Sequence, residues 1–321
     1  MDDIAVSVVI ITYKHENYIR QCLDSVFMQK TNFNFEVIVG EDASPDNTRA
    51  ILLEYKEKYG DKLVLVLHDK NLGPSGNSRS IQKLVRGRYI ASVEGDDFWT
   101  DENKLQRQYD VLENNPQYSA VGCNFIDVDC NGNLRRNNVM KISTDEVKTM
   151  YDWIHEGYTV HTCTVLRRNI LPIHDEKYIK LKTAKPTMGD MITFTLLYDA
   201  GDIYVIKDEM AAHRAAGKND TSSFSFQEKK DPLKYVYMYK DIIDLLDEYL
   251  EHKYDFTPKV IDKVARVKLR KILRQATYSV SEMNKFLSPL GCKFRIKANL
   301  RLLYILARGV KRKVLRKNGK K

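Results

Sequence analysis

Three acidic side chains fall within four consecutive residues, Glu94-Gly95-Asp96-Asp97. Hard divalent cations such as Mg²⁺ and Mn²⁺ prefer oxygen ligands, and they usually keep part of their coordination shell for water and substrate phosphate. A few carboxylates at a strand end, with Gly95 allowing a tight backbone turn, could hold such an ion against a diphosphate. The alternative is a solvated acidic turn that caps a helix over residues 101–113.

Polar residues follow other strand-like segments in the same way. Residues 4–12 are apolar and β-branched and end at Thr12-Tyr13, and residues 35–41 end at Glu41-Asp42. The acidic stretch itself follows residues 89–93. Ligands of parallel α/β sheets bind beyond the carboxyl ends of the strands. One acidic strand end is common because carboxylates cap helices, but three polar strand ends on one edge favour a binding site.

Segments with helical spacing of apolar residues alternate with these strands. In the first half we expect strands over residues 4–12, 35–41, 63–68 and 89–93 and helices over residues 16–28, 46–59 and 75–85. This alternation predicts an α/β fold, with a mainly parallel sheet flanked by helices on both faces. Further on we expect helices over residues 104–113, 145–155 and 190–198 and strands over residues 119–128, 159–166, 202–207 and 209–214.

The C-terminal part of the chain differs from the rest in pattern and in charge. From residue 227 onward we expect only helices, over residues 227–252, 258–277 and 294–314. The chain has 52 Lys and Arg against 43 Asp and Glu, a net charge of +9, and beyond Lys259 only Asp262 and Glu282 are acidic. We therefore divide the chain into an α/β domain, residues 1–225, and a basic helical extension, residues 226–321, whose expected partner is anionic.

The end of the extension has the pattern of a basic amphipathic helix. Apolar residues recur at helical spacing at Leu300, Leu303, Tyr304, Ala307, Val310 and Val314, accompanied by Arg301, Arg308, Lys311, Arg312, Lys313, Arg316 and Lys317. Such helices lie in a membrane interface, so we expect attachment to an anionic membrane surface. The alternative is that the apolar stripe packs on the body and the charge keeps the protein soluble.

Several stretches of the α/β domain occur together in a way that resembles the family 2 glycosyltransferases of the GT-A fold, which make bacterial surface polysaccharides. They are Ser7-Val8-Val9-Ile10-Ile11-Thr12-Tyr13, Phe35-Glu36-Val37-Ile38-Val39-Gly40-Glu41-Asp42-Ala43-Ser44, Asn71-Leu72-Gly73, Gly87-Arg88-Tyr89-Ile90-Ala91, Glu94-Gly95-Asp96-Asp97-Phe98-Trp99 and Lys104-Leu105-Gln106-Arg107-Gln108. The resemblance covers about residues 4–215. It implies inverting transfer of a sugar from a nucleotide-sugar, UDP-linked, to a hydroxyl of a lipid-linked saccharide.

The resemblance also implies the residues of the donor site, which would be Thr12, Tyr13, Asp42, Asn71, Gly73, Asn77, Glu94, Asp96 and Arg214. Thr12, Tyr13 and Asp42 would line the uridine pocket. Asp96 and Asp97 would hold a Mn²⁺ or Mg²⁺ ion, although the sequence does not assign which acid contacts it. For Tyr13 and Asn71, a packing aromatic and a turn residue are equally good interpretations.

On the acceptor side, Asp190 stands where family members carry the acid that opens a helix and removes the acceptor proton. Its alternative role, as the N-cap of that helix, is compatible with this one. Trp99, His161 and Thr162 are candidates for acceptor contacts, against simple packing roles. Two positions depart from the family pattern: Ala216 replaces a His that follows Arg214, and Ser78-Arg79 replaces an Arg-Asn pair.

The location that we expect is cytoplasmic, peripheral on the inner face of the plasma membrane. The acidic start of the chain does not resemble a secretory signal, no stretch reaches the roughly 18 apolar residues of a spanning helix, and the five cysteines are scattered as in a reducing compartment.

Three other interpretations remain. A nucleic-acid-binding protein would use the basic tail, but the chain lacks interleaved aromatic platforms or a zinc pattern, so we expect no nucleic acid partner. A dinucleotide oxidoreductase would need a Gly-x-Gly-x-x-Gly turn after the first strand, where residues 13–17 have none. A catalytically silent family member is the third, for which Ala216 is the only support.

Overall fold

The computed structural model describes residues 3–184, 188–215, 230–274, 296–297 and 300. The chain divides into two compact units. The first comprises Met1–Trp153 and Tyr158–Asp220, and the second comprises Ile154–Gly157 and Thr221–Lys321. The sheet and the acidic stretch belong to the first unit. The domain boundary expected at residue 225 stays a prediction.

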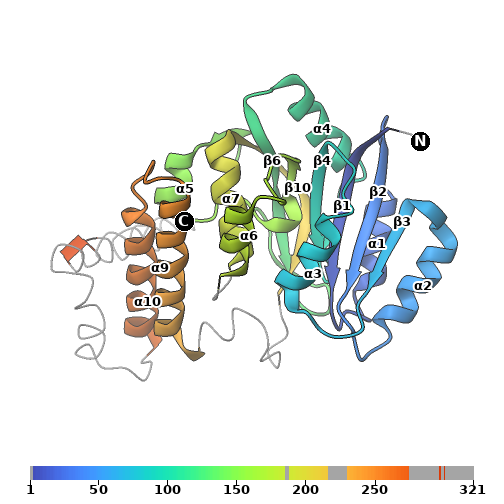
Figure 1. Ribbon diagram of the computed structural model, residues 1–321, viewed down its shortest axis with the longest axis horizontal. Helices are drawn as coiled ribbons and strands as arrows, with labels where there is room; N and C mark the ends of the chain where they lie inside the picture. The colour runs from blue at the N-terminus through green and yellow to red at the C-terminus, as the bar shows by residue number, and fades with distance from the viewer. Residues whose placement is uncertain (1–2, 185–187, 216–229, 275–295, 298–299, 301–321) are drawn as a thin grey trace, which may run out of the picture. The chain divides into compact units, whose positions relative to one another are not determined.

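Strand β1 (Ile4–Thr12) lies in the middle of the parallel half of the sheet (Figure 1). It pairs in parallel with β2 (Asn34–Glu41) on one side and with β4 (Tyr89–Glu94) on the other, and β3 (Leu63–Leu67) continues the sheet beyond β2. Most residues of β1 are buried on both faces, which explains its nearly continuous β-branched sequence, because parallel sheets are covered on both sides.

Helices cover both faces of this half of the sheet. One core joins the even-numbered residues of β1 to α1 (Ile19–Phe27), α2 (Thr48–Tyr59) and α4 (Lys104–Asn114). A second core, of Val9, Ile38, Ile81 and Ile90, places α3 (Gly73–Gln82) on the opposite face. The alternation of β-strand side chains between two faces produces this division. The α/β prediction is confirmed.

The second half of the sheet mixes directions, which the sequence did not predict. The strand order is β3-β2-β1-β4-β9-β6-β10-β5. Strands β6 (Tyr118–Val128) and β10 (Asp202–Arg214) are parallel, whereas β9 (Leu166–Arg168) is antiparallel to both β4 and β6. The short strands β5 (Phe98–Trp99) and β8 (Glu146–Lys148) pair with β10, and β7 (Leu134–Arg136) pairs with β6, all antiparallel.

Three expected elements were wrong. The helix expected over residues 145–155 is β8 followed by α5 (Met150–Glu156), because Thr149 donates its backbone N–H to Asp152 at 2.8 Å and begins the helix there. The strand expected over residues 159–166 is a 3₁₀ turn, Thr162–Thr164, before β9. The two strands expected over residues 202–214 form one strand, whose register shifts where Lys207, Asp208 and Glu209 are exposed. Helix α6 (Glu176–Thr183) precedes α7 (Gly189–Ala200).

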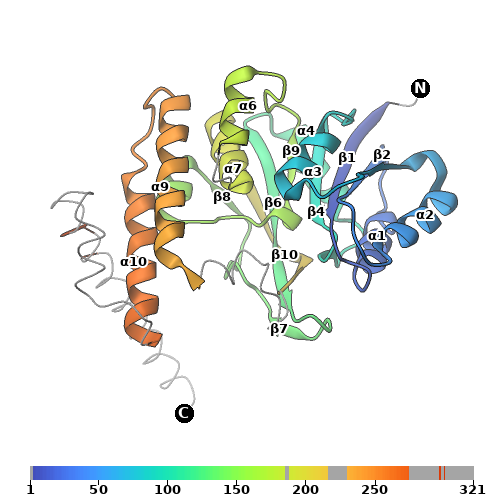
Figure 2. The same cartoon turned by 60° about the horizontal axis from the view of Figure 1, so that its bottom comes forward.

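In the second unit, α9 (Pro232–Tyr249) and α10 (Thr257–Arg274) lie side by side in both views (Figures 1 and 2). Buried apolar side chains of α9, including Ile242 and Leu246, alternate with exposed polar ones. Within the described part of the chain, no helix combines the length and the apolar character needed to cross a membrane. The basic helix expected over residues 294–314 lies almost entirely outside the described residues.

Candidate functional site

The register of the parallel strands brings the three polar strand ends together. Thr12 pairs with Glu41, and Ile11 pairs with Glu94. Beyond the strands, Asp42 donates its backbone N–H to Thr12 O at 3.1 Å, and Gly95 donates its own to Ile11 O at 3.0 Å. The prediction that these ends share one edge of the sheet is therefore confirmed, and we call this edge, with Thr12, Asp42 and residues 94–97, the rim.

Gly95 is required by close packing between these ends. A Cβ atom at this position would lie 2.6 Å from Thr12 Oγ1 and 2.7 Å from His15 Nδ1. Both distances are well inside van der Waals contact. The absence of a side chain thus lets the acidic stretch approach the end of β1.

Asp97 is buried, with 2% of its surface exposed, and Arg214 fixes its position. The Arg214 backbone N–H donates to Asp97 Oδ1 at 2.8 Å, and its guanidinium Nε donates to Asp96 O at 2.9 Å. The same guanidinium donates to Gln21 Oε1 at 2.6 Å and to Asp129 O at 3.2 Å. Arg214 therefore braces the backbone of the acidic stretch, a role that the sequence did not reveal.

The carboxylates of the stretch repel one another. The Glu94 side chain is exposed, but many protein atoms lie around its carboxyl group and desolvate it. This desolvation, together with the negative charges of Asp97 and Asp96, raises the pKa of the Glu94 carboxyl to about 8. Burial and the charge of Asp96 raise the pKa of Asp97 to about 7. A divalent cation would offset this repulsion, so the donor set fits Mn²⁺ or Mg²⁺.

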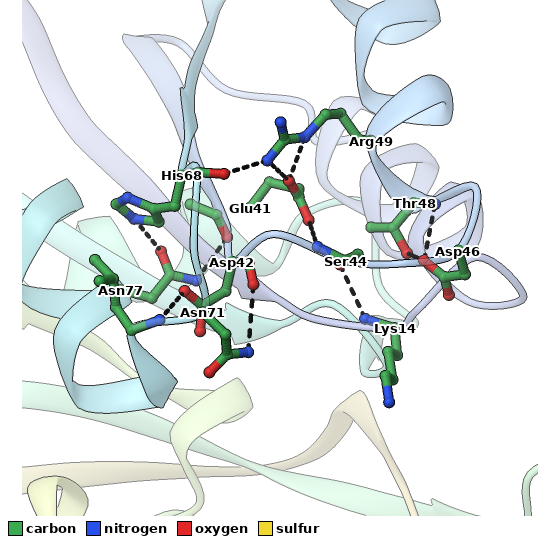
Figure 3. A network of polar contacts seen from close by, with 12 residues as sticks. Lys14, Glu41, Asp42, Ser44, Asp46, Thr48, Arg49, His68, Asn71 and Asn77 are labelled. Carbon is green, nitrogen blue, oxygen red and sulfur yellow. Dashed lines mark hydrogen bonds and ion pairs between the residues drawn. The ribbon is translucent and has the colours of Figure 1, made fainter.

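The end of β2 carries two acids with different surroundings (Figure 3). Glu41 is fully buried; it accepts from Arg49 Nε at 2.6 Å and from Ser44 N at 2.5 Å, so it shapes the turn. Asp42 is also buried, with 2% of its surface exposed, but it faces the loop before α3, where its Oδ1 accepts from Leu72 N at 2.7 Å. Of the two acids, Asp42 is the one oriented toward the predicted nucleotide-binding loop.

The residues expected to border the nucleotide hold that loop together. Asn71 Nδ2 donates to Asp42 O at 3.3 Å, and Asn71 Oδ1 accepts from Gly73 N at 3.1 Å. Gly73 has φ +73°, a conformation that favours glycine. Asn77 is buried and donates to Gly40 O at 2.8 Å, which ties α3 to β2 (Figure 3). Their predicted contacts with a nucleotide stay predictions.

Two residues beside the rim have a left-handed backbone although neither is glycine. Lys14 has φ 59° and Ala43 has φ 56°, one residue after Tyr13 and Asp42 respectively. Lys14 N donates to Ser44 Oγ at 3.0 Å, which links the two turns (Figure 3). Such strain persists where surrounding structure fixes it, often at binding sites. Tyr13, 37% exposed, is open to a ligand.

His15 is a site residue that the sequence reasoning missed. Its Nδ1 lies 3.2 Å from Thr12 Oγ1, and its Nε2 lies 4.0 Å from Asp96 Oδ1. Its backbone N–H donates to Thr48 Oγ1 at 2.9 Å, so α2 holds the loop in place. The only available signal was its position three residues after the end of β1.

Asp190 lies in the first turn of α7 and is exposed. The N-cap of this helix is Met188, so the N-cap role considered for Asp190 was wrong by two positions. Its Oδ1 accepts from Met191 N at 2.8 Å. The negative charge of Asp190 also contributes to the raised pKa of Glu94, which places Asp190 near the acidic stretch.

The candidate acceptor residues fall into two groups. Trp99 is 1% exposed; its Nε1 donates to Cys163 O at 3.0 Å and its ring packs against Lys104, so the ring has no free face for a sugar. His161 and Thr162 are half-buried on the 3₁₀ turn. Burial and the nearby His213 lower the pKa of His161 to about 3, so its imidazole is neutral.

Known proteins resemble this chain in sequence and in fold. The model of glycosyl transferase family 2 matches residues 7–172. Uncharacterized protein Rv1520 of Mycobacterium tuberculosis is 40% identical over 111 residues, 35% of this chain and 32% of that protein. Escherichia coli WfgD, named UDP-Glc:alpha-D-GlcNAc-diphosphoundecaprenol beta-1,3-glucosyltransferase, is 34% identical over 115 residues, 36% of this chain and 44% of that protein. The matches thus span less than half the length of these relatives.

The structure of S. aureus TarS 1-349 in complex with UDP superposes with a TM-score of 0.60 at 20% identity, covering 88% of this chain and 78% of that one. At this identity the likeness supports the fold, and the predicted GT-A architecture is confirmed. The family match includes the ends of β1, β2 and β4, which carry Thr12, Asp42 and the acidic stretch. Because it also covers more than half of the 321 residues, the protein belongs to glycosyl transferase family 2.

Proposed function

We propose that the protein transfers a sugar from a nucleotide-sugar to a hydroxyl of a saccharide acceptor in surface polysaccharide synthesis. The observation that carries the proposal is the meeting of Thr12, Asp42 and the acids of residues 94–97 at one edge of the parallel sheet. UDP is the proposed nucleotide. Two similar proteins support this choice: TarS, whose structure is in complex with UDP, and WfgD, whose name gives UDP-Glc as its donor. The WfgD name also supports a lipid-linked acceptor.

In this proposal the rim divides into a base side and a phosphate side. Asp42 accepts a hydrogen bond from the base, and the exposed ring of Tyr13 packs on it. Asn71, Gly73 and Asn77 keep the bordering loop in shape through the hydrogen bonds described above. Fixed donors and acceptors of this kind orient a ligand without reorganising at the moment of reaction.

Asp96 and Asp97 are the proposed ligands of a Mn²⁺ or Mg²⁺ ion, with Glu94 beside the ribose. When bound, the ion would act as a Lewis acid that neutralises charge on the departing diphosphate. Arg214 holds both aspartates through their backbone and carboxylate contacts. We therefore assign Arg214 a positioning role in place of the expected diphosphate contact.

Asp190 is the proposed base of an inverting transfer. An exposed carboxylate near the acidic stretch can accept the proton of an acceptor hydroxyl as that oxygen attacks the anomeric carbon. His161 and Thr162 remain candidates for acceptor contacts, since both reach solvent on the 3₁₀ turn. Trp99 is not included because its ring is buried.

We also propose that the basic end of the chain holds the protein at an anionic membrane surface on the cytoplasmic side. Each Lys or Arg near such a surface contributes on the order of 1 kcal/mol. Deleting residues 295–321 should abolish co-sedimentation with liposomes that contain anionic lipid. Undiminished co-sedimentation of the truncated protein would refute this attachment, and uncharged liposomes serve as the control.

The test of the donor site is a thermal-shift series with UDP-, GDP- and dTDP-sugars, each with and without Mn²⁺. We expect stabilisation by a UDP-sugar that depends on Mn²⁺, because a ligand that binds only the folded state stabilises it, and the stabilisation grows with the logarithm of ligand concentration over Kd. Asp97→Asn should remove the Mn²⁺ dependence. Asp110→Asn, on an exposed position of α4, is the matched control and should keep it.

If no nucleotide-sugar stabilises the protein, the proposed function fails. If Asp97→Asn keeps the full Mn²⁺-dependent shift, the metal assignment fails while donor binding stands. If one nucleotide-sugar stabilises the protein most, that compound defines the donor, because a few pocket contacts decide which sugar binds.

A further inference from the structure

Asp97 has two close neighbours outside the acidic stretch that are also metal-ligand side chains. One carboxylate oxygen of Asp97, one imidazole nitrogen of His161 and the sulfur of Cys163 all lie within 4.8 Å of one another. His161 Nδ1 is 3.2 Å from Cys163 Sγ. Ligand atoms around a tetrahedral Zn²⁺ ion lie about 3.5 Å apart, given Zn–N and Zn–O distances of about 2.1 Å and a Zn–S distance of about 2.3 Å. The distance between His161 and Cys163 is close to that spacing, and the Asp97 oxygen lies within 4.8 Å of both ligand atoms.

The backbone that presents His161 and Cys163 is held on several sides. Thr164 donates to His161 O through its N–H at 2.9 Å and its hydroxyl at 2.7 Å. The indole of Trp99 donates to Cys163 O at 3.0 Å, and Trp99 follows Asp97 by two residues. The 3₁₀ turn is therefore tied to the segment that follows the acidic stretch, and a fixed backbone on both sides favours a shared ligand.

The chemistry of the three groups selects the class of ion. Mg²⁺ prefers oxygen ligands in an octahedral shell, and a cysteine sulfur does not suit it. A carboxylate, an imidazole and a thiolate together suit Zn²⁺, and three protein ligands leave a fourth position open. Asp97 and Cys163 are buried while His161 is half-buried, so solvent reaches the cluster on the His161 side.

We propose that Asp97, His161 and Cys163 form a three-ligand site for a divalent transition metal of the Zn²⁺ class. On binding, the Cys163 S–H bond breaks, the proton passes to solvent, and the sulfur coordinates as thiolate. The site goes beyond the proposed transfer reaction, because that reaction gives Cys163 no role. Thiolate coordination by Cys163 can also be measured without any substrate. It shares Asp97 with the proposed donor site, so an ion held here withdraws that carboxylate from a donor-bound Mn²⁺.

Cobalt titration of the full-length protein, freed of metal by a chelator, tests the site. Co²⁺ bound to a thiolate gives a charge-transfer absorption in the near ultraviolet, and a four-coordinate site gives strong visible bands. We expect both signals at one equivalent, and displacement by Zn²⁺. Cys163→Ser should lose the charge-transfer band. His161→Ala should weaken Co²⁺ binding by more than about 100-fold, since even outer partners of metal ligands are worth about 10- to 100-fold.

Cys130→Ser is the matched control, because Cys130 is a free, partly exposed cysteine outside the cluster, and it should keep the full spectrum. A wild-type protein without the thiolate band, or a band that survives in Cys163→Ser, overturns the proposal. The Mn²⁺-dependent nucleotide-sugar shift is measured on a separate metal-free sample that receives no cobalt, because an ion in this site would withdraw Asp97 from donor-bound Mn²⁺. Donor binding without the cobalt band refutes only the site, and the band without donor binding refutes only the proposed function.

Discussion

The backbone N–H of Arg214 donates to the Asp97 carboxylate at 2.8 Å, across 117 residues of sequence. This bond joins the last residue of β10 to the acidic stretch that follows β4. The guanidinium of the same residue reaches Asp96 O and lies over the rings of Tyr18 and Phe98. The geometry of the acidic stretch therefore depends on the far end of the sheet.

Replacing Arg214 should damage both stability and the site. Arg214→Ala removes three guanidinium hydrogen bonds from a buried position. Because hydrogen bonds to charged groups contribute about 1.5–3 kcal/mol each and are not additive, we expect a loss on the order of 3 kcal/mol in the free energy of unfolding. Guanidinium denaturation monitored by circular dichroism measures it.

The control for this change is Arg20→Ala. Arg20 pairs with Glu54 at 2.6 Å on the surface, where both side chains are more than half exposed. Exposed ion pairs contribute little, so this variant should unfold like the wild type. Equal losses from the two substitutions would show that the buried contacts of Arg214 do not stabilise the fold.

A methyl group at position 95 should weaken donor binding. In Gly95→Ala the new Cβ would lie 2.6 Å from Thr12 Oγ1 and 2.7 Å from His15 Nδ1, so the rim must shift. We expect a smaller nucleotide-sugar thermal shift, with a measurable loss of the protein's own stability. Gly189→Ala is the control, because its added Cβ meets only the flexible end of Lys182, at 3.6 Å. Unchanged donor affinity in Gly95→Ala would contradict the close packing of the rim.

The strand ends could be predicted because long apolar runs mark the buried strands of a parallel sheet, and ligands of such sheets bind beyond the carboxyl ends of the strands. The β-branched runs of residues 4–12 and 35–41 are buried on both faces, and their polar ends had to meet on one edge. The placement of Thr12, Asp42 and the acidic stretch followed from this. Their roles toward ligand came from the family resemblance and stay predictions.

The region from residue 145 to residue 168 could not be predicted in the same way. Glu146–Lys148 is a strand only because it pairs with Ile203–Val205 of β10, and tertiary pairing overrides local helix preference. The contacts of Cys163 and His15 arise where distant segments meet, 66 and 81 residues from Asp97 and Asp96 respectively. No spacing along the chain signals such contacts.

Lys182 should make stability depend on pH at the alkaline end. Its ammonium donates to Gly189 O and Thr193 Oγ1, both at 2.8 Å. Burial and then repulsion from Arg167 lower its pKa to about 8, from 10.5. Between these values the folded state has released a proton that the unfolded state still binds, so stability rises with pH across that window and is constant below it.

The comparison of the wild type with Lys182→Met isolates this effect. Denaturation at about pH 7.5 and about pH 9.5 should show a larger gain in stability for the wild type than for the variant. Lys180→Met, on an exposed position of the same helix, should behave as the wild type does. A wild-type gain no larger than that of Lys182→Met would mean that the ammonium is not perturbed.

Asp190→Asn should separate transfer from donor binding. The amide is nearly isosteric with the carboxylate, and its oxygen can still accept from Met191 N, a bond of 2.8 Å in the wild type. It cannot take a proton, and a positioned general base typically contributes about 10²- to 10⁴-fold to the rate. We therefore expect turnover to fall by about that factor, measured by release of the nucleotide diphosphate, while the thermal shift with the nucleotide-sugar is unchanged.

The control is Asp199→Asn, near the other end of α7, which should keep full turnover. A fully active Asp190→Asn would exclude this residue as the base. An interaction made only in the transition state leaves ground-state binding intact. Joint loss of turnover and donor binding would therefore place Asp190 in the donor site instead.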